Sequence, residues 1–577
     1  MTPRNWHFVA GTALVTAIAL LVQAPAATAP GPRRVRLSMD VESASAVPAR
    51  KGQRQRVPMI DDFSSRAVLF PEVVREDRAD RVRRDARFQQ QYLRRHARRP
   101  AGNPRGGNGR GAASREGEVV RDWSYSLNLG SGGTISAPAK YVFDITAAAS
   151  CTNDFVVTGV NIAGSATQAN LIAFNSLYNM PAGNGLCPGT APNVLFAYNI
   201  GPGTINSYVA LSLDGTKVAF SESGVGARFH VLRWATGAGN GTSAAAPATP
   251  GAGNAAVDSV IALTGTSSTA PFIDYSSDTA YVTTNDGLVH KFSGVFLGTL
   301  AEVTTGGWPV ATAGLALSTP VFDGVSRRLF FTSSQGRIYY VDDSVVPAVL
   351  SPTFFAFAAN GITAAPLMVD SGNQKVYAFA GNNGGTNAVV AQADTSLSAG
   401  SQVIANVGLN TANLSPLMGD VNEAYYDGVS ASARMYVTGN TSTANRVPAL
   451  YALSFNASFR LNAAPANGPV ALATNVAGLS ASPVTAFFNS TLNRQFIFVG
   501  VSNNCSAAVT TGCIRSINVT GGAFPTAASV NNVILAAAGG TGGISIDNNS
   551  GAVGAASVYY TTRTGRTIVK ATQAGLQ

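Results

Sequence analysis

The chain has 577 residues, of which 12% are charged, 46% are hydrophobic and 60 are glycine. This composition excludes wholesale disorder, coiled coil and collagen, and it is typical of a loop-rich globular protein. The net charge of +10 is concentrated in one region, because residues 30–118 hold 21 Lys+Arg and 11 Asp+Glu, whereas residues 119–577 hold 18 and 19. The large C-terminal part therefore has no basic field for specific nucleic-acid binding.

Residues 1–29 have the features of a secretory signal peptide. Arg4 precedes an apolar stretch that ends in small residues, and cleavage is expected after Ala29. An uncleaved membrane anchor is the alternative. No other apolar run reaches the roughly 18 residues that span a bilayer, and no cysteine precedes Cys151. We therefore expect a secreted or periplasmic protein that is not a lipoprotein and has no transmembrane span after cleavage.

Residues 30–118 form a basic arm. Within it, residues 70–99 place acidic and basic side chains three and four positions apart, which favours an exposed helix with a narrow apolar stripe. Residues 101–114 are a flexible, Gly-rich linker by composition. We interpret the arm as a disordered tether or pro-segment, and its removal is then expected to leave the rest of the protein folded. Binding to an acidic polymer or an anionic envelope surface is the alternative.

Residues 119–577 repeat one pattern of short strands. The two clearest copies, residues 269–292 and 318–341, have a small residue before Pro, an apolar strand that ends in Asp, a second strand, a Gly turn and a third strand. Six weaker copies begin near Tyr141, Val209, Ala364, Leu414, Ala481 and Gly543. A further strand-like run lies between copies. Eight copies of four strands predict an all-β fold, an eight-bladed β-propeller, with seven blades as the alternative.

The copy STPVFDGVSRRLFFTSSQGRIYYV, residues 318–341, resembles the repeat of quinoprotein-like (pyrroloquinoline-quinone-dehydrogenase-like) β-propellers. The resemblance implies a fold rather than an activity, since some members are dehydrogenases that hold a quinone and calcium, and others are envelope scaffolds. The dehydrogenases typically have an adjacent cysteine pair over the cofactor and a repeated Trp between blades. Here no cysteines are adjacent, and residues 119–577 contain only Trp123, Trp234 and Trp308. No cofactor is therefore predicted.

The last copy supplies only three strands, near Ile544, Tyr559 and Ile568. An open fourth position would leave an unpaired strand edge. Residues 122–129 alternate Trp, Tyr and Leu with polar residues, which is the pattern of a half-buried strand. We predict that this segment is the outer strand of the eighth blade and joins the two ends of the propeller.

The four cysteines follow an export signal, so two disulfides are expected. In an antiparallel four-stranded blade the first and third hairpin loops lie on one face, and Cys151 and Cys187 fall in those loops of blade one. Cys505 and Cys513 bracket the middle hairpin of blade seven. We therefore predict the pairs Cys151–Cys187 and Cys505–Cys513. Metal binding by these cysteines is disfavoured because neither pair has a CxxC spacing.

Two histidines occupy equivalent third-strand positions in neighbouring copies. His230 and His290 each lie 16 residues after the aspartate of their copy, Asp214 and Asp274. A paired acid/base or metal site is one interpretation. The next copy has Tyr339 at this offset, which favours a packing position instead.

Asp420, Glu423 and Asp427 cluster in one predicted loop and are candidate calcium ligands, because oxygen-rich loops suit hard cations. Calcium is the only ion that the sequence suggests. The other aspartates that end first strands are expected to accept backbone N–H groups at the following turn. No HExxH, GxSxG or Walker pattern is present.

These features predict a monomeric binding or scaffolding module that contacts a protein or an extracellular polymer through its propeller loop faces. The alternative is an extracytoplasmic enzyme, either a divergent quinoprotein oxidoreductase or a lyase or hydrolase, with its site in the central channel. Scarce histidine, few charged side chains and the absence of a catalytic motif weigh against the enzyme.

Overall fold

The structure is a computed structural model. It describes residues 33–39, 56–96, 119–127, 136–180, 185–189, 191–235, 239–359, 365–410, 418–443, 445–474, 479–527, 534–548, 550, 552, 554–573 and 576. The predicted signal peptide and the Gly-rich linker lie outside these residues. Among the helices of the described part, none is long and apolar enough to cross a membrane.

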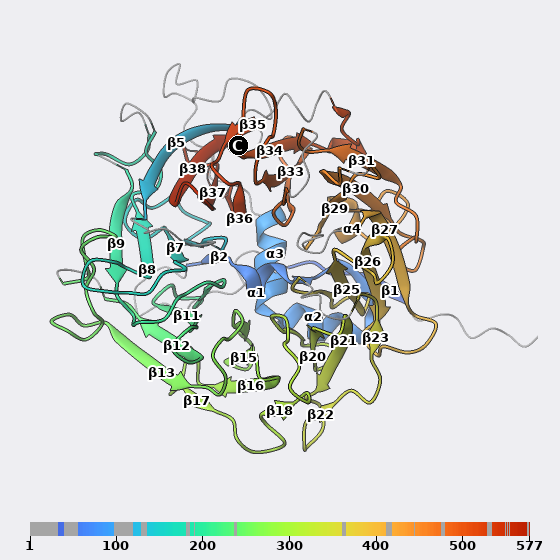
Figure 1. The fold of residues 1–577 in the computed structure, drawn as a ribbon, viewed down its shortest axis with the longest axis horizontal. Helices are drawn as coiled ribbons and strands as arrows, with labels where there is room; N and C mark the ends of the chain where they lie inside the picture. Colours follow the sequence, from blue (N-terminus) through green and yellow to red (C-terminus); the bar gives the residue numbers. More distant parts are fainter. Residues whose placement is uncertain are drawn as a thin grey trace, which may run out of the picture.

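Eight antiparallel sheets form a ring around a central axis, so the fold is an eight-bladed β-propeller, as predicted (Figure 1). The first four blades are β6 to β9 (Ala139–Val142, Phe155–Gly159, Leu171–Asn175, Asn193–Tyr198), β10 to β13 (Ala210–Leu211, Lys217–Glu222, Arg228–Arg233, Val257–Ala262), β14 to β18 (Phe272–Asp274, Thr279–Thr283, Leu288–Ser293, Ala301–Glu302, Val310–Ala311) and β19 to β23 (Val321–Asp323, Arg328–Ser333, Arg337–Asp342, Val349–Leu350, Phe355–Ala356).

The last four blades complete the ring. They are β24 to β27 (Met368–Asp370, Lys375–Ala380, Asn387–Asp394, Val403–Leu409), β28 to β31 (Asp420–Val421, Arg434–Asn440, Pro448–Ser454, Asn467–Ala471), β32 to β35 (Thr485–Asn489, Arg494–Val501, Cys513–Asn518, Ile534–Ala536) and β36 to β38 (Thr541–Asp547, Ser557–Thr562, Thr567–Gln573) with β5 (Val119–Ser126).

The repeated Asp and Gly positions shape the turns of each blade. Asp274 accepts the backbone N–H of Ser276 at 3.2 Å, which fixes the turn after the first strand. Gly287 has a φ of +86°, and a Cβ there would lie 2.7 Å from the backbone nitrogen of Leu315. Only glycine therefore fits this turn between the second and third strands without strain.

The ring is closed by β5, which pairs antiparallel with β38 as the outer strand of blade eight, as the sequence predicts. Trp123 lies opposite Lys570 in this ladder. The Lys570 ammonium donates to the Asp122 carboxylate, and both side chains are fully buried. Thr572 Oγ1 also donates to Asp122, at 2.6 Å. We call the β5–β38 pair the clasp.

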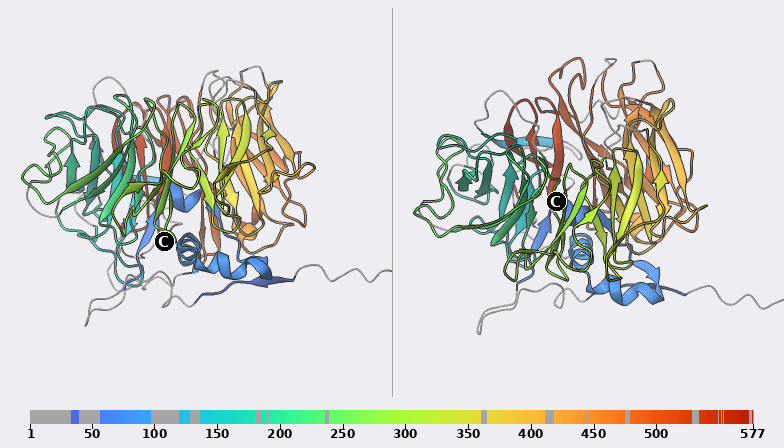
Figure 2. Two further views of the ribbon diagram at one scale, coloured as in Figure 1. Left: turned by 90° about the horizontal axis from the view of Figure 1, so that it is seen from below. Right: turned by 60° about the horizontal axis from the view of Figure 1, so that its bottom comes forward.

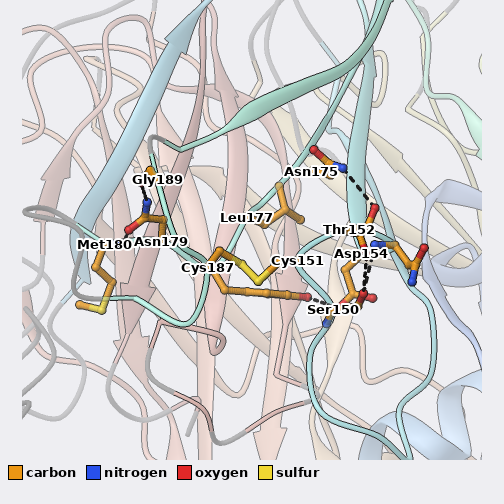
Figure 3. The surroundings of a disulfide bond; sticks show 12 residues. Ser150, Cys151, Thr152, Asp154, Asn175, Leu177, Asn179, Met180, Cys187 and Gly189 are labelled. Carbon is orange, nitrogen blue, oxygen red and sulfur yellow. Dashed lines mark hydrogen bonds between the residues drawn. A yellow bond between two sulfur atoms is a disulfide. The ribbon is translucent and has the colours of Figure 1, made fainter. Parts of the chain in front are cut away.

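Both predicted disulfides are present. Cys151 lies in the β6–β7 loop and Cys187 in the β8–β9 loop, and the bond between them joins the two loops on one face of blade one (Figure 3). Cys505 and Cys513 close the middle hairpin of blade seven. Two disulfides are compatible with an extracellular location.

The arm is not a disordered tether over residues 56–96, which we call the plug. This segment contains β2 (Met59–Asp61), α1 (Phe63–Arg66), β3 (Val68–Leu69), β4 (Val73–Arg75), a 3₁₀ turn (Glu76–Arg78), α2 (Ala79–Arg84) and α3 (Ala86–His96). Figures 1 and 2 show that α1 lies inside the ring and that α2 lies under one face of it. A further strand, β1 (Arg34–Arg36), pairs with β4.

The helix predicted over residues 70–99 is confirmed in part, as α2 and α3, but it is neither continuous nor exposed. Asp85 is extended between α2 and α3, and its carboxylate accepts the N–H of Arg87 at 2.9 Å, so the helix breaks there. Val74, Val82 and Phe88 are each 0% exposed and belong to one core with blades three to five. The narrow apolar stripe is therefore buried against the propeller of the same chain.

Candidate functional site

The plug is bonded to every blade of the ring. It adds β2 as an inner strand of blade one and β3 as an inner, parallel strand of blade five. The contacts with the other blades are hydrogen bonds. They join Asp62 to Leu211 N (3.1 Å), Ser64 to Ile273 N (3.1 Å), Arg87 to Phe322 O (3.3 Å), Glu72 N to Tyr426 O (2.8 Å), Arg66 to Thr485 Oγ1 (3.3 Å) and Asp61 to Ile546 N (2.8 Å).

A buried ion cluster holds the plug on the axis. The Asp61 carboxylate, 3% exposed, accepts from the Arg66 guanidinium and from Arg94 Nη2 at 3.0 Å. Burial raises the pKa of Asp61, but the two arginines and the Ile546 N–H lower it by more than burial raises it. The pKa of Asp61 therefore lies well below its usual value. Asp61 is therefore ionised across the physiological range, and its charge is compensated inside the channel.

Little space remains around the Arg66 side chain inside the ring. Two cavities border Arg66, one of about 70 Å³ beside Asp420 and one of about 30 Å³ beside Asp62. Each has room for a few water molecules only. A quinone with calcium, as the quinoprotein resemblance implies for its enzyme members, does not fit these residues. In the described part of the chain, no three His, Cys, Asp or Glu side chains are grouped to hold a metal ion.

The three candidate calcium ligands have separate partners, which for Glu423 and Asp427 are arginines of the arm. Asp420 accepts the N–H groups of Val421 (2.8 Å) and Ala486 (2.7 Å), and burial raises its pKa to about 6. Glu423 lies 3.7 Å from Arg95 Nε, and Asp427 pairs with Arg36 at 3.0 Å. Glu423 and Asp427 therefore hold the arm against blade six, and Asp420 joins blade six to blade seven.

The two histidines lie in separate polar clusters. His230 is 2% exposed and stacks on Phe220, with Nδ1 3.0 Å from Asp258 and Nε2 3.4 Å from Glu222. His290 Nδ1 lies 2.6 Å from Glu302 in blade three. Each ring packs between strands of its own blade. This geometry agrees with the packing interpretation and does not join the two rings in one site.

We expect replacement of His230 by Gln to reduce stability more at pH 5.5 than at pH 9. Burial lowers the pKa of His230, but hydrogen bonds to Asp258 and Glu222 raise it to a net value above 6.5. Because the pKa of His230 is higher in the folded state than in the unfolded state, its protonated ring stabilises the folded protein. This contribution is fully present below the unperturbed pKa of 6.5 and is lost as the pH rises through the folded-state pKa. Urea unfolding of the unmodified protein and of the variant at the two pH values tests this. The same loss in the free energy of unfolding at both pH values would contradict the prediction.

A groove of about 520 Å³ lies between the arm and blades five and six. Arg34, Arg75 and Arg78 of the arm line it together with Lys375, and Asp394 is the one carboxylate among the described residues of its lining. We call it the basic groove. It lies on the face where the first strands end, because Gly372 to Gln374 follow β24 directly.

The charges of the basic groove are only partly compensated. Arg75 pairs with Asp77 at 3.1 Å, and Lys375 pairs with Asp394. Arg78, by contrast, has a carbonyl partner, Gly372 O at 3.1 Å. Burial and the charge of Arg75 lower the pKa of Arg78 by more than Asp77, Asp370 and Asp323 raise it, so an additional anion in the groove would further stabilise the charged form of Arg78.

No family model matches the chain, and no curated protein matches it. Its shape is similar to two solved propellers. Sqt1 of Chaetomium thermophilum is 11% identical, with 80% of this chain and 98% of that chain covered and a TM-score of 0.42. The Cps50 (Swd1) β-propeller domain of Myceliophteria thermophila is 10% identical, with 79% and 99% covered and a TM-score of 0.35. Neither likeness bears on function.

The basic groove was not predicted from the sequence, because the residues that line it are far apart in the chain. Arg34 Nη2 donates to Asn373 Oδ1 at 2.7 Å across 339 positions. The excess of arginine in residues 30–118 was a usable signal, and it correctly indicated a basic surface. The side of the propeller on which these arginines gather depends on the plug, which the repeat pattern does not reveal.

Proposed function

We propose that the protein is an exported binding module that holds an acidic segment of a protein partner in the basic groove. The observation that carries the proposal is the incompletely compensated arginine group of Arg34, Arg75 and Arg78 in the lining of this groove of about 520 Å³. Guanidinium groups bind carboxylates in paired geometry, and an acidic peptide presents several carboxylates in a row. The quinoprotein-like kinship remains a prediction.

Two further observations support a binding role in place of catalysis. The plug occupies the channel in which an enzyme site was the alternative, and it leaves cavities of about 70 and 30 Å³ beside Arg66 and one of about 260 Å³ at the mouth. The groove lining has hydroxyl and amide groups from Thr395, Ser396, Ser458 and Asn373, which can bond a peptide backbone. No aromatic side chain lines the groove among the described residues, so a flat sugar ring has no stacking surface there.

Fluorescence anisotropy with a labelled hexaglutamate peptide tests the proposal. We expect saturable binding that weakens as salt is added, and the double variant R75Q/R78Q should bind at least about tenfold more weakly, because two charge-assisted contacts are lost. Arg233→Gln is the matched control. Arg233 is exposed on blade two, far from the groove lining, and its variant removes one charge without touching the site.

Three results would contradict this function. Hexaglutamine could bind as tightly as hexaglutamate, the double variant could bind unchanged, or R233Q could lose as much affinity as R75Q/R78Q. Preference for polygalacturonate over the peptide would also overturn it, since the partner would then be an acidic polysaccharide. Circular dichroism and melting curves establish that each variant is folded.

A further inference from the structure

The mouth of the channel opposite the basic groove contains a second cavity, of about 260 Å³, which we call the mouth pocket. Residues at or just before the first strand of every blade line it, from Ser136 in blade one to Gly542 in blade eight. First strands begin at this mouth and end at the face that carries the arm. The mouth pocket is therefore separate from the basic groove.

The floor of the mouth pocket is aromatic. Phe63 of α1 stacks on Tyr208 with a centroid distance of 5.2 Å and an interplanar angle of 11°. Met418, Pro366 and Pro483 add apolar surface around this pair. A small apolar group can lie against such a floor with most of its surface removed from water.

One side of the mouth pocket carries a charge that no carboxylate neutralises. Arg563, on the turn between β37 and β38, is the only charged residue among the described residues of the lining. Its Nη1 donates to Ser480 Oγ at 3.0 Å, and its buried Nε has no hydrogen-bond partner. The hydroxyl of Ser207 in the same lining is also buried without a partner. Buried polar groups are rarely left in this state.

We propose that the mouth pocket binds a small organic monoanion, with its carboxylate on Arg563 and Ser207 and its apolar part on the Phe63–Tyr208 pair. The two unpaired donors would satisfy two oxygens of one carboxylate, and the aromatic floor sets the size of the apolar part. Tyr208 lies within the electrostatic influence of both Arg66 and Arg563, so the floor also favours a negative ligand. The site does not depend on the function proposed for the basic groove.

Calorimetric titration of the full chain with benzoate tests this proposal, and benzamide serves as the neutral ligand of the same shape. We expect benzoate to bind with one-to-one stoichiometry and benzamide to bind at least about tenfold more weakly, since only benzoate accepts charge-assisted bonds. Arg563→Gln should reduce benzoate affinity by a similar factor, and R233Q should leave it unchanged.

Equal affinity for benzoate and benzamide, or unchanged benzoate binding by R563Q, would overturn the proposal. So would the absence of heat at millimolar benzoate. A tripeptide that ends in phenylalanine, compared with its C-terminal amide, distinguishes a free acid from a peptide terminus. Tighter binding of the acid form than of benzoate would support the pocket and identify the carboxylate as a chain end. The benzoate–benzamide comparison needs no variant, so it holds even if R563Q is unstable.

Discussion

A chain that begins at Val119, without the arm, is expected to aggregate or to melt at least about 10 °C below the full-length protein. Removal of the arm uncovers the inner edges of β6 and β24, which the plug strands β2 and β3 cover in the full-length protein. It also exposes the apolar surface that Val74, Val82 and Phe88 bury. Calorimetry and size-exclusion chromatography measure both outcomes. The sequence alone predicts the opposite, a folded propeller.

The matched control is a chain with a protease site inserted in residues 101–114 and then cleaved. The plug contacts are non-covalent and persist after this cut, so both pieces should elute together and melt within a few degrees of the intact chain. If the truncated and full-length chains melted at the same temperature, the plug would be a peripheral element.

Replacement of Asp122 by Ala in the clasp is expected to destabilise the protein by about 3–5 kcal/mol, because it leaves a buried ammonium without its partner. Lys570 and Asp122 are both fully buried, and Thr572 cannot neutralise the remaining charge. Burial lowers the pKa of Lys570 even beside Asp122. Urea unfolding at pH 7 gives the change in the free energy of unfolding.

The double variant D122L/K570M distinguishes a charge effect from a packing effect. It removes both charges and keeps apolar volume, so it should recover most of the lost stability. If the double variant were as unstable as Asp122→Ala, the packing of these two side chains, and not their charges, would stabilise the pairing of β5 with β38.

The ring was predictable because local patterns determine it. The Asp and Gly positions of the repeat set the turns, as Asp274 and Gly287 show. The alternation around Trp123 identified the clasp once the last copy was seen to lack a strand. The disulfides followed from the hairpin loops in which Cys151 and Cys187 lie.

The plug and the cavities were not predictable in this way. The burial of Phe88 depends on blades that lie hundreds of positions later, and no local pattern reports such a partner. Asp85 interrupts the helix through its extended backbone, within a run of charges that otherwise favours helix. The carboxylates proposed for calcium were correctly seen as a cluster in sequence, but Asp427 pairs with Arg36 of the arm.

The contacts that close the ring also determine the order in which the protein can fold. Asp61 bonds Ile546 across 485 positions, and Asp122 bonds Lys570 across 448. Contacts of such high sequence separation form slowly, because a long loop must close before they contribute. The N-terminal segments are synthesised first, and their strand edges therefore remain unpaired until the C-terminal segments have been synthesised. A chain stalled before β36 therefore has neither a closed ring nor the contact of Asp61 in the plug with Ile546.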